Sequence, residues 1–177
     1  MKSKVLAISA ISAGLTAICL TVGVYFEFAE FISLILSSIS ILLPLYYRSY
    51  KGAILCYLVG GLIGLIFCGF NLLSLVYPAY FLFFGIYPII KNLFVEKKVN
   101  KYISILIGFI WCMLCIYGIF FYCIFVLNMS LNEFPLWIVE NVYFLLIPLG
   151  IFFFFVYDRF IKVSKIVLDR YLYKIVK

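Results

Sequence analysis

Apolar residues run through the chain in six long segments, each separated from the next by a short polar or charged stretch. The segments cover residues 5–26, 28–47, 53–70, 72–90, 102–127 and 137–157. A helix rises about 1.5 Å per residue and the hydrocarbon core of a bilayer is about 30 Å thick, so about 20 apolar residues suffice to cross it. The pattern predicts an all-α polytopic membrane protein with six transmembrane helices.

The composition points to the same class. Apolar residues make up 68% of the 177 positions and charged residues 12%, whereas a soluble domain is about half apolar and about a quarter charged. A soluble fold of this length cannot hide so many large apolar side chains. The first segment follows Lys2 and Lys4 like a signal peptide, but it is longer than a signal-peptide core, so we expect a retained first helix.

The positive charges are confined to a few places. All 14 Lys and Arg residues fall in four groups, which are Lys2 and Lys4; Arg48 and Lys51; Lys91, Lys97, Lys98 and Lys101; and Arg159, Lys162, Lys165, Arg170, Lys174 and Lys177. With six helices these groups all lie on one side of the membrane, whereas five helices would scatter them over both. The positive-inside rule then places both termini in the cytoplasm.

The chain after the last apolar segment has a different character, which divides it into a six-helix transmembrane domain, 1–157, and a basic cytoplasmic tail, 158–177. Arg159, Lys162 and Lys165 recur at helical spacing, and Ile161 and Leu168 belong to an apolar stripe. This pattern predicts an amphipathic helix that lies on the anionic inner leaflet. A docking site for a cytoplasmic partner is the alternative, and nucleic-acid binding is not expected.

Few residues in the chain are suited to catalysis. There is no histidine, there are only seven carboxylates, and no phosphate-binding loop or nucleophile–base pair occurs. The six cysteines lie in apolar stretches, and the Cys112-x-x-Cys115 pair falls in the middle of a predicted helix, where we interpret the cysteines as packing residues. We therefore expect no enzymatic activity, no metal and no cofactor.

Small residues form rows along the first helix. Ala13 and Ala17 lie one turn apart, and Ala10 and Gly14 form a parallel row. Such rows let helix backbones approach closely in lipid, where packing drives association. The rows are either an internal helix–helix contact or a docking face for another membrane subunit.

The fourth segment is predicted to kink. Pro78, Gly85 and Pro88 interrupt it, and each proline removes a backbone donor, so the freed carbonyls need other partners. Tyr77 and Tyr80 lie near the first proline. These aromatic residues either line a cavity open to the outside or belong to the aromatic belt of the membrane interface.

The remaining polar residues gather on the predicted outer side and suggest a shallow pocket. Glu140 falls within the last span, where a carboxylate usually faces the bundle interior or water, although a later helix start would leave it at the interface. The candidate substrate-binding residues are Glu27, Glu30, Asn71, Tyr77, Tyr80, Trp137, Glu140 and Asn141. With no Lys or Arg on that side, a neutral or cationic small molecule is the expected ligand.

This layout resembles the substrate-binding S components of energy-coupling-factor (ECF) vitamin transporters. The shared features are six helices, both ends inside, a similar length and an alanine-rich first helix. The resemblance implies that Ala13 and Ala17, with Ala10 and Gly14, dock onto a transmembrane coupling subunit that works with ATPases. The first outer loop departs from the family, because only residues 25–30 are available for it.

Three functions are compatible with the sequence. The first is an S-component-like binding subunit, the second is a small membrane scaffold or accessory protein without a ligand, and the third is a lipid-directed membrane enzyme, which the lack of a dense polar cluster disfavours. The Lys- and Ile-rich, His-free composition is typical of an AT-rich bacterial genome. We expect a multi-pass protein of a bacterial plasma membrane.

Overall fold

The part of the chain that the structure describes is almost entirely helical. The structure is a computed structural model that describes residues 3–71, 74–127 and 136–176, with side chains placed in these ranges except at 136–140 and 172–176. The helices are α1 (Ser3–Tyr25), the short 3-10 helix η1 (Glu27–Ala29), α2 (Glu30–Tyr46), α3 (Tyr50–Phe67), α4 (Val76–Ala79), the π-helical segment η2 (Tyr80–Phe84), α5 (Tyr87–Glu96), α6 (Lys101–Phe125) and α7 (Leu136–Val176).

Six helical runs within these ranges are long and apolar enough to cross a membrane. They are Ser3–Tyr25, Glu27–Tyr46, Tyr50–Phe67, Val76–Glu96, Lys101–Phe125 and Asn141–Tyr171. The prediction of an all-α chain with six apolar helices is confirmed. The fourth span runs from α4 through η2 to α5, and it ends several residues later than the apolar segment 72–90 suggests.

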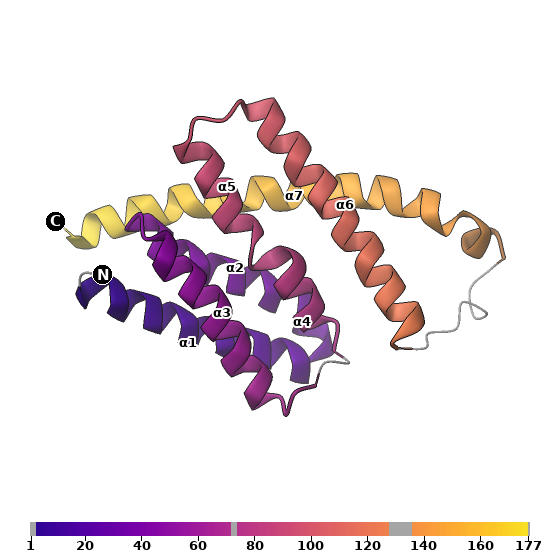
Figure 1. Ribbon diagram of the computed structural model, residues 1–177, viewed down its shortest axis with the longest axis horizontal. Coiled ribbons are helices and arrows are strands. Elements are labelled where there is room, and N and C mark those ends of the chain that lie inside the picture. The colour runs from indigo at the N-terminus through magenta and orange to yellow at the C-terminus, as the bar shows by residue number, and fades with distance from the viewer. Residues whose placement is uncertain (1–2, 72–73, 128–135, 177) are drawn as a thin grey trace.

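The segments that carry the described basic residues lie toward one end of the molecule. In Figure 1 the N-terminus, the α2–α3 turn and the C-terminus lie on the left, and the α5–α6 connection lies at the upper left. Arg48 and Lys98 adopt left-handed backbone conformations in these two turns, with φ of 53° and 52°. Ser49 and Asn100 then cap α3 and α6 by accepting backbone N–H bonds. We call this end of the bundle the basic end.

Helices α1 and α3 pack closely through small residues. A Cβ atom added at Gly60 would lie 2.8 Å from the Thr16 Cβ and 3.0 Å from the Ala13 carbonyl oxygen, and one at Gly64 would lie 3.4 Å from the Ala17 carbonyl oxygen. At Gly60 only glycine leaves room for this approach, whereas a Cβ atom at Gly64 would make an ordinary van der Waals contact. Small residues bring helices together in lipid in this way.

The predicted kink in the fourth span is present, and its freed carbonyls have side-chain partners. Gly85 donates to the Tyr80 carbonyl in π-helical register, which frees the Phe81 carbonyl to accept from the Tyr57 hydroxyl at 2.9 Å. Pro88 has no N–H for the Phe84 carbonyl, which accepts from Ser38 at 2.9 Å instead. The helix is therefore interrupted where side chains of α2 and α3 donate hydrogen bonds to the carbonyls that have lost their backbone partners.

Helix α7 continues without a break from the last span into the tail. Its 41 residues correspond to about 60 Å at about 1.5 Å per residue, twice the thickness of the hydrocarbon core. The helix shows no interruption between Tyr157 and Asp158, where the sequence suggested a boundary between two regions. The attachment of the tail to the inner leaflet stays a prediction.

Candidate functional site

A charged cluster is buried where α5 packs against α7. Asp158 is 5% exposed and Lys91 is 8% exposed. The Lys91 ammonium lies 2.8 Å from Asp158 Oδ1, the Tyr87 hydroxyl also donates to Oδ1, and Lys162 donates to Oδ2. Both carboxylate oxygens are thus satisfied. A charge buried next to a membrane is costly unless an opposite charge and hydrogen bonds compensate it, as they do here.

A second set of polar contacts joins α7 to the kinked span. The Ser38 hydroxyl lies 2.8 Å from the Tyr157 hydroxyl and 2.9 Å from the Phe84 carbonyl oxygen. The Ser38 hydroxyl also lies 2.9 Å from the Leu34 carbonyl oxygen of its own helix, so its single proton is shared among these acceptors, and either hydroxyl of the Ser38–Tyr157 pair can be the donor. These buried hydrogen bonds therefore join α2, the kinked span and α7.

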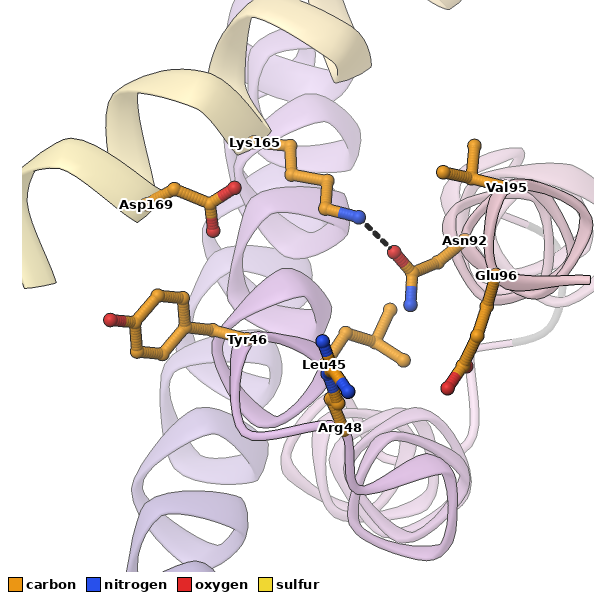
Figure 2. A pocket seen from close by; sticks show the side chains of 8 residues that line it. All are labelled: Leu45, Tyr46, Arg48, Asn92, Val95, Glu96, Lys165 and Asp169. Atoms are coloured by element: carbon orange, nitrogen blue, oxygen red, sulfur yellow. Dashed lines mark hydrogen bonds between the residues drawn. The ribbon is translucent and has the colours of Figure 1, made fainter. Parts of the chain in front are cut away.

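A polar pocket opens at the basic end, between the end of α2, α5 and α7 (Figure 2). Its volume is about 470 Å³, and it is lined by Leu45, Tyr46, Arg48, Asn92, Val95, Glu96, Lys165 and Asp169. Asn92 is nine-tenths buried, accepts a hydrogen bond from Lys165 and donates one to the Tyr50 hydroxyl at 3.0 Å. Tyr50 in turn donates to Glu96. The hydrogen bonds of Asn92 thus connect α3, α5 and α7.

An apolar cavity lies between α2, the kinked span, α6 and α7. Its volume is also about 470 Å³, and it is lined by Phe31, Leu34, Ala79, Phe83, Phe84, Cys112, Cys115, Ile116, Ile119, Leu149, Phe152, Phe153 and Val156. Leu34, Phe83 and Cys112 are buried and form its floor, whereas Leu149 and Phe152 are exposed at its rim. The cavity has no polar lining, and the helical runs around it are long and apolar enough to cross a membrane.

The cysteine pair of the sequence lies on this floor. Cys112 and Cys115 are 1% and 6% exposed, and both are free thiols. Cys115 donates to the Leu82 carbonyl at 3.4 Å. Among the residues that the structure describes, no group of three His, Cys, Asp or Glu side chains is placed to hold a metal ion. The pair thus faces the apolar cavity as packing side chains.

The predicted outer-side residues occupy different surroundings. Glu27 and Asn71 are exposed, and Glu30 is half-buried. Tyr77 and Tyr80 are 0% exposed, and the Tyr80 hydroxyl donates to the Tyr57 carbonyl at 3.0 Å.

None of these five residues lines either cavity described above. Asn141 is exposed on α7, and the side chains of Trp137 and Glu140 lie outside the described part of the chain. The pocket on the outer side stays a prediction.

The two small-residue rows of α1 have different neighbours. Ala13 and Ala17 are 5% and 2% exposed and lie against Gly60 and Gly64 of α3. Ala10 is exposed, and nothing lies within 4 Å of a Cβ atom added at Gly14. Within the described part of the chain, α3 covers the row of Ala13 and Ala17, whereas the row of Ala10 and Gly14 is left uncovered.

Six long apolar helices, with large apolar side chains exposed along the outer faces of α1, α6 and α7, are the features of a multi-pass membrane protein. Comparison with protein-family models, with curated proteins and with solved structures found no match to this chain.

Proposed function

We propose that this protein is a non-catalytic membrane subunit that binds a lipophilic small molecule in the apolar cavity, in the manner of an S component of a bacterial importer. The observation that carries the proposal is the cavity itself, whose volume of about 470 Å³ falls within the about 300–1,000 Å³ typical of small-molecule sites. We expect the protein to reside in the plasma membrane.

The chemistry of the lining selects the ligand. Phe31, Phe83 and Phe153 contribute aromatic walls, and no charged side chain lines the cavity. A cationic ligand would lose its hydration there without a counter-charge, which costs several kcal/mol. Of the two ligand types that the sequence allows, the neutral one therefore fits this cavity. Leu149 and Phe152 of α7 are exposed at the rim of the cavity, and a ligand dissolved in the bilayer would enter past them.

The uncovered row of α1 supplies a docking face. Ala10 and Gly14 leave the helix backbone accessible to a neighbouring helix, and packing of this kind is favourable in lipid. A transmembrane coupling subunit that works with ATPases is the partner that the importer role requires. Ala13 and Ala17 lie on the side of α1 that packs against α3, so they hold the helix in place while Ala10 and Gly14 stay accessible.

The proposal is tested by purifying the full chain from its native membrane in mild detergent, followed by mass spectrometry of bound small molecules and proteins. The wild type should carry one lipophilic molecule per chain and co-purify with its partners. Ala79→Leu extends a side chain into the cavity, so the bound molecule should fall at least about tenfold, or about 1.4 kcal/mol, with partners retained. Gly14→Trp blocks the uncovered row, so partners should be lost with the molecule retained.

Each variant is the control for the other, because they change separate surfaces. A wild-type protein that purifies empty and alone would contradict the proposal and favour a scaffold without a ligand. Partners without any bound molecule would also favour an accessory role. If Ala79→Leu leaves the amount of bound molecule unchanged, the molecule lies elsewhere.

A further inference from the structure

The polar pocket at the basic end has a charge pattern that the proposed function does not use. Two cationic and two anionic side chains line it, so its formal charges sum to zero while remaining separated in space. In Figure 2, Lys165 and Arg48 approach the middle of the pocket from opposite sides, and Asp169 and Glu96 lie on the two flanks. Such a lining complements a ligand that is itself zwitterionic.

Two of the four charged groups are not paired with any side chain that the structure describes. Among the described residues, the side chains of Arg48 and Asp169 make no hydrogen bond or ion pair, whereas Lys165 is held by Asn92 and Glu96 by Tyr50. Because Asn92 is nine-tenths buried, it fixes the position of the Lys165 ammonium. The pocket thus holds one fixed cation, with a free guanidinium and a free carboxylate beside it.

The position of the pocket indicates where its ligand comes from. The spans Glu27–Tyr46 and Val76–Glu96 end at the pocket, so it lies at the boundary between hydrocarbon and water. The buried Leu45 gives it an apolar side toward the bundle, and the exposed Val95 adds an apolar group at its edge. Lipid headgroups occupy this level of a membrane, and their acyl chains run alongside the adjacent spans.

We propose that this pocket binds the headgroup of a phosphoethanolamine lipid of the adjacent leaflet. The phosphate lies between Arg48 and Lys165, where a guanidinium can donate two parallel hydrogen bonds to its oxygens. The primary ammonium then donates to Asp169 on the flank. An anionic lipid without an amine leaves Asp169 unpaired beside the phosphate, so it binds less well.

The site is tested with purified, delipidated full-length protein by native mass spectrometry, titrating phosphatidylethanolamine, phosphatidylcholine and phosphatidylglycerol in separate experiments. The ethanolamine lipid should bind about tenfold more tightly than either of the others. The choline headgroup has no N–H donors and the glycerol headgroup has no amine. Arg48→Gln should weaken all three lipids, and Asp169→Asn should remove the preference for ethanolamine while phosphatidylglycerol still binds.

Lys51→Gln is the matched control, because it removes an exposed cation one turn from Arg48 that does not line the pocket. It should leave all three affinities unchanged. Equal binding of the three lipids, or equal effects of Arg48→Gln and Lys51→Gln, would overturn the proposal. So would glycerophosphoethanolamine binding as tightly as the intact lipid, since the ligand would then be a soluble molecule. Retention of helicity and a single elution peak in each variant exclude misfolding as the cause.

Discussion

Gly60→Leu is expected to separate α1 from α3 and to destabilise the protein by about 3 kcal/mol, the upper end of what overpacking costs. The added Cβ would lie 2.8 Å from the Thr16 Cβ and 3.0 Å from the Ala13 carbonyl oxygen. The backbone oxygen cannot move without shifting the whole helix. Thermal unfolding in detergent, followed by size-exclusion chromatography, measures the loss.

Gly14→Leu is the matched control for this prediction. It makes the same substitution on the partner helix α1, where nothing lies within 4 Å of the new Cβ atom. We expect its midpoint of unfolding to stay close to that of the wild type. Equal destabilisation by the two variants would contradict close packing of α1 on α3 and indicate a general intolerance of larger residues.

Asp158→Asn is expected to have the second large effect. Lys91 would remain nearly buried with no carboxylate within reach, and breaking a buried ion pair by removing one partner costs about 3–5 kcal/mol. We expect a correspondingly lower unfolding midpoint and a looser contact between α5 and α7. Hydrogen exchange along α5 is the measurement that localises the effect.

Two further variants show whether the loss of stability comes from the unpaired buried charge or from any substitution of this kind on α7. Asp169→Asn is the same substitution on the same helix at an exposed position, and its effect on stability should be small. The double variant Asp158→Asn with Lys91→Met removes both charges, so it should recover most of the stability that Asp158→Asn loses. Failure of the double variant to recover would contradict the assigned pairing.

The features that follow from local sequence were predicted correctly. Six apolar runs are sufficient to predict six long helices, because a span is defined by its own length and composition. Pro78, Gly85 and Pro88 act on their own helix, so the kink could be anticipated as well. The small residues of α1 indicated close packing, but the sequence left open whether a helix of this chain or a partner would cover them.

The buried charges were missed for a physical reason. Lys91 follows an apolar run and Asp158 begins a basic stretch, so both have the sequence surroundings of ordinary flanking residues at the ends of spans. Their pairing depends on how α5 packs against α7, a contact between segments far apart in the chain. The polar pocket at the basic end was missed for the same reason, since α2, α5 and α7 each contribute only a few of its residues.

The apolar cavity is even less accessible to sequence reasoning. In a soluble protein an apolar side chain is usually buried, but in a membrane protein the lipid-facing and interior side chains are equally apolar. Phe152 at the rim and Phe83 at the floor therefore look alike in the sequence. The sequence instead directed attention to outer-side polar residues such as Glu27 and Asn71, which are exposed.

The orientation of the six spans is the arrangement on which both binding proposals depend, and epitope tags measure it most directly. Tags are placed at the N-terminus, after Lys98, after Asn71 and at the C-terminus of the full chain, and antibody access is compared between intact and permeabilised spheroplasts. We predict that only the tag after Asn71 is detected in intact cells, because the other three lie at the basic end. Detection of either terminus from outside, or protection of the Asn71 tag, would contradict this orientation of the six spans.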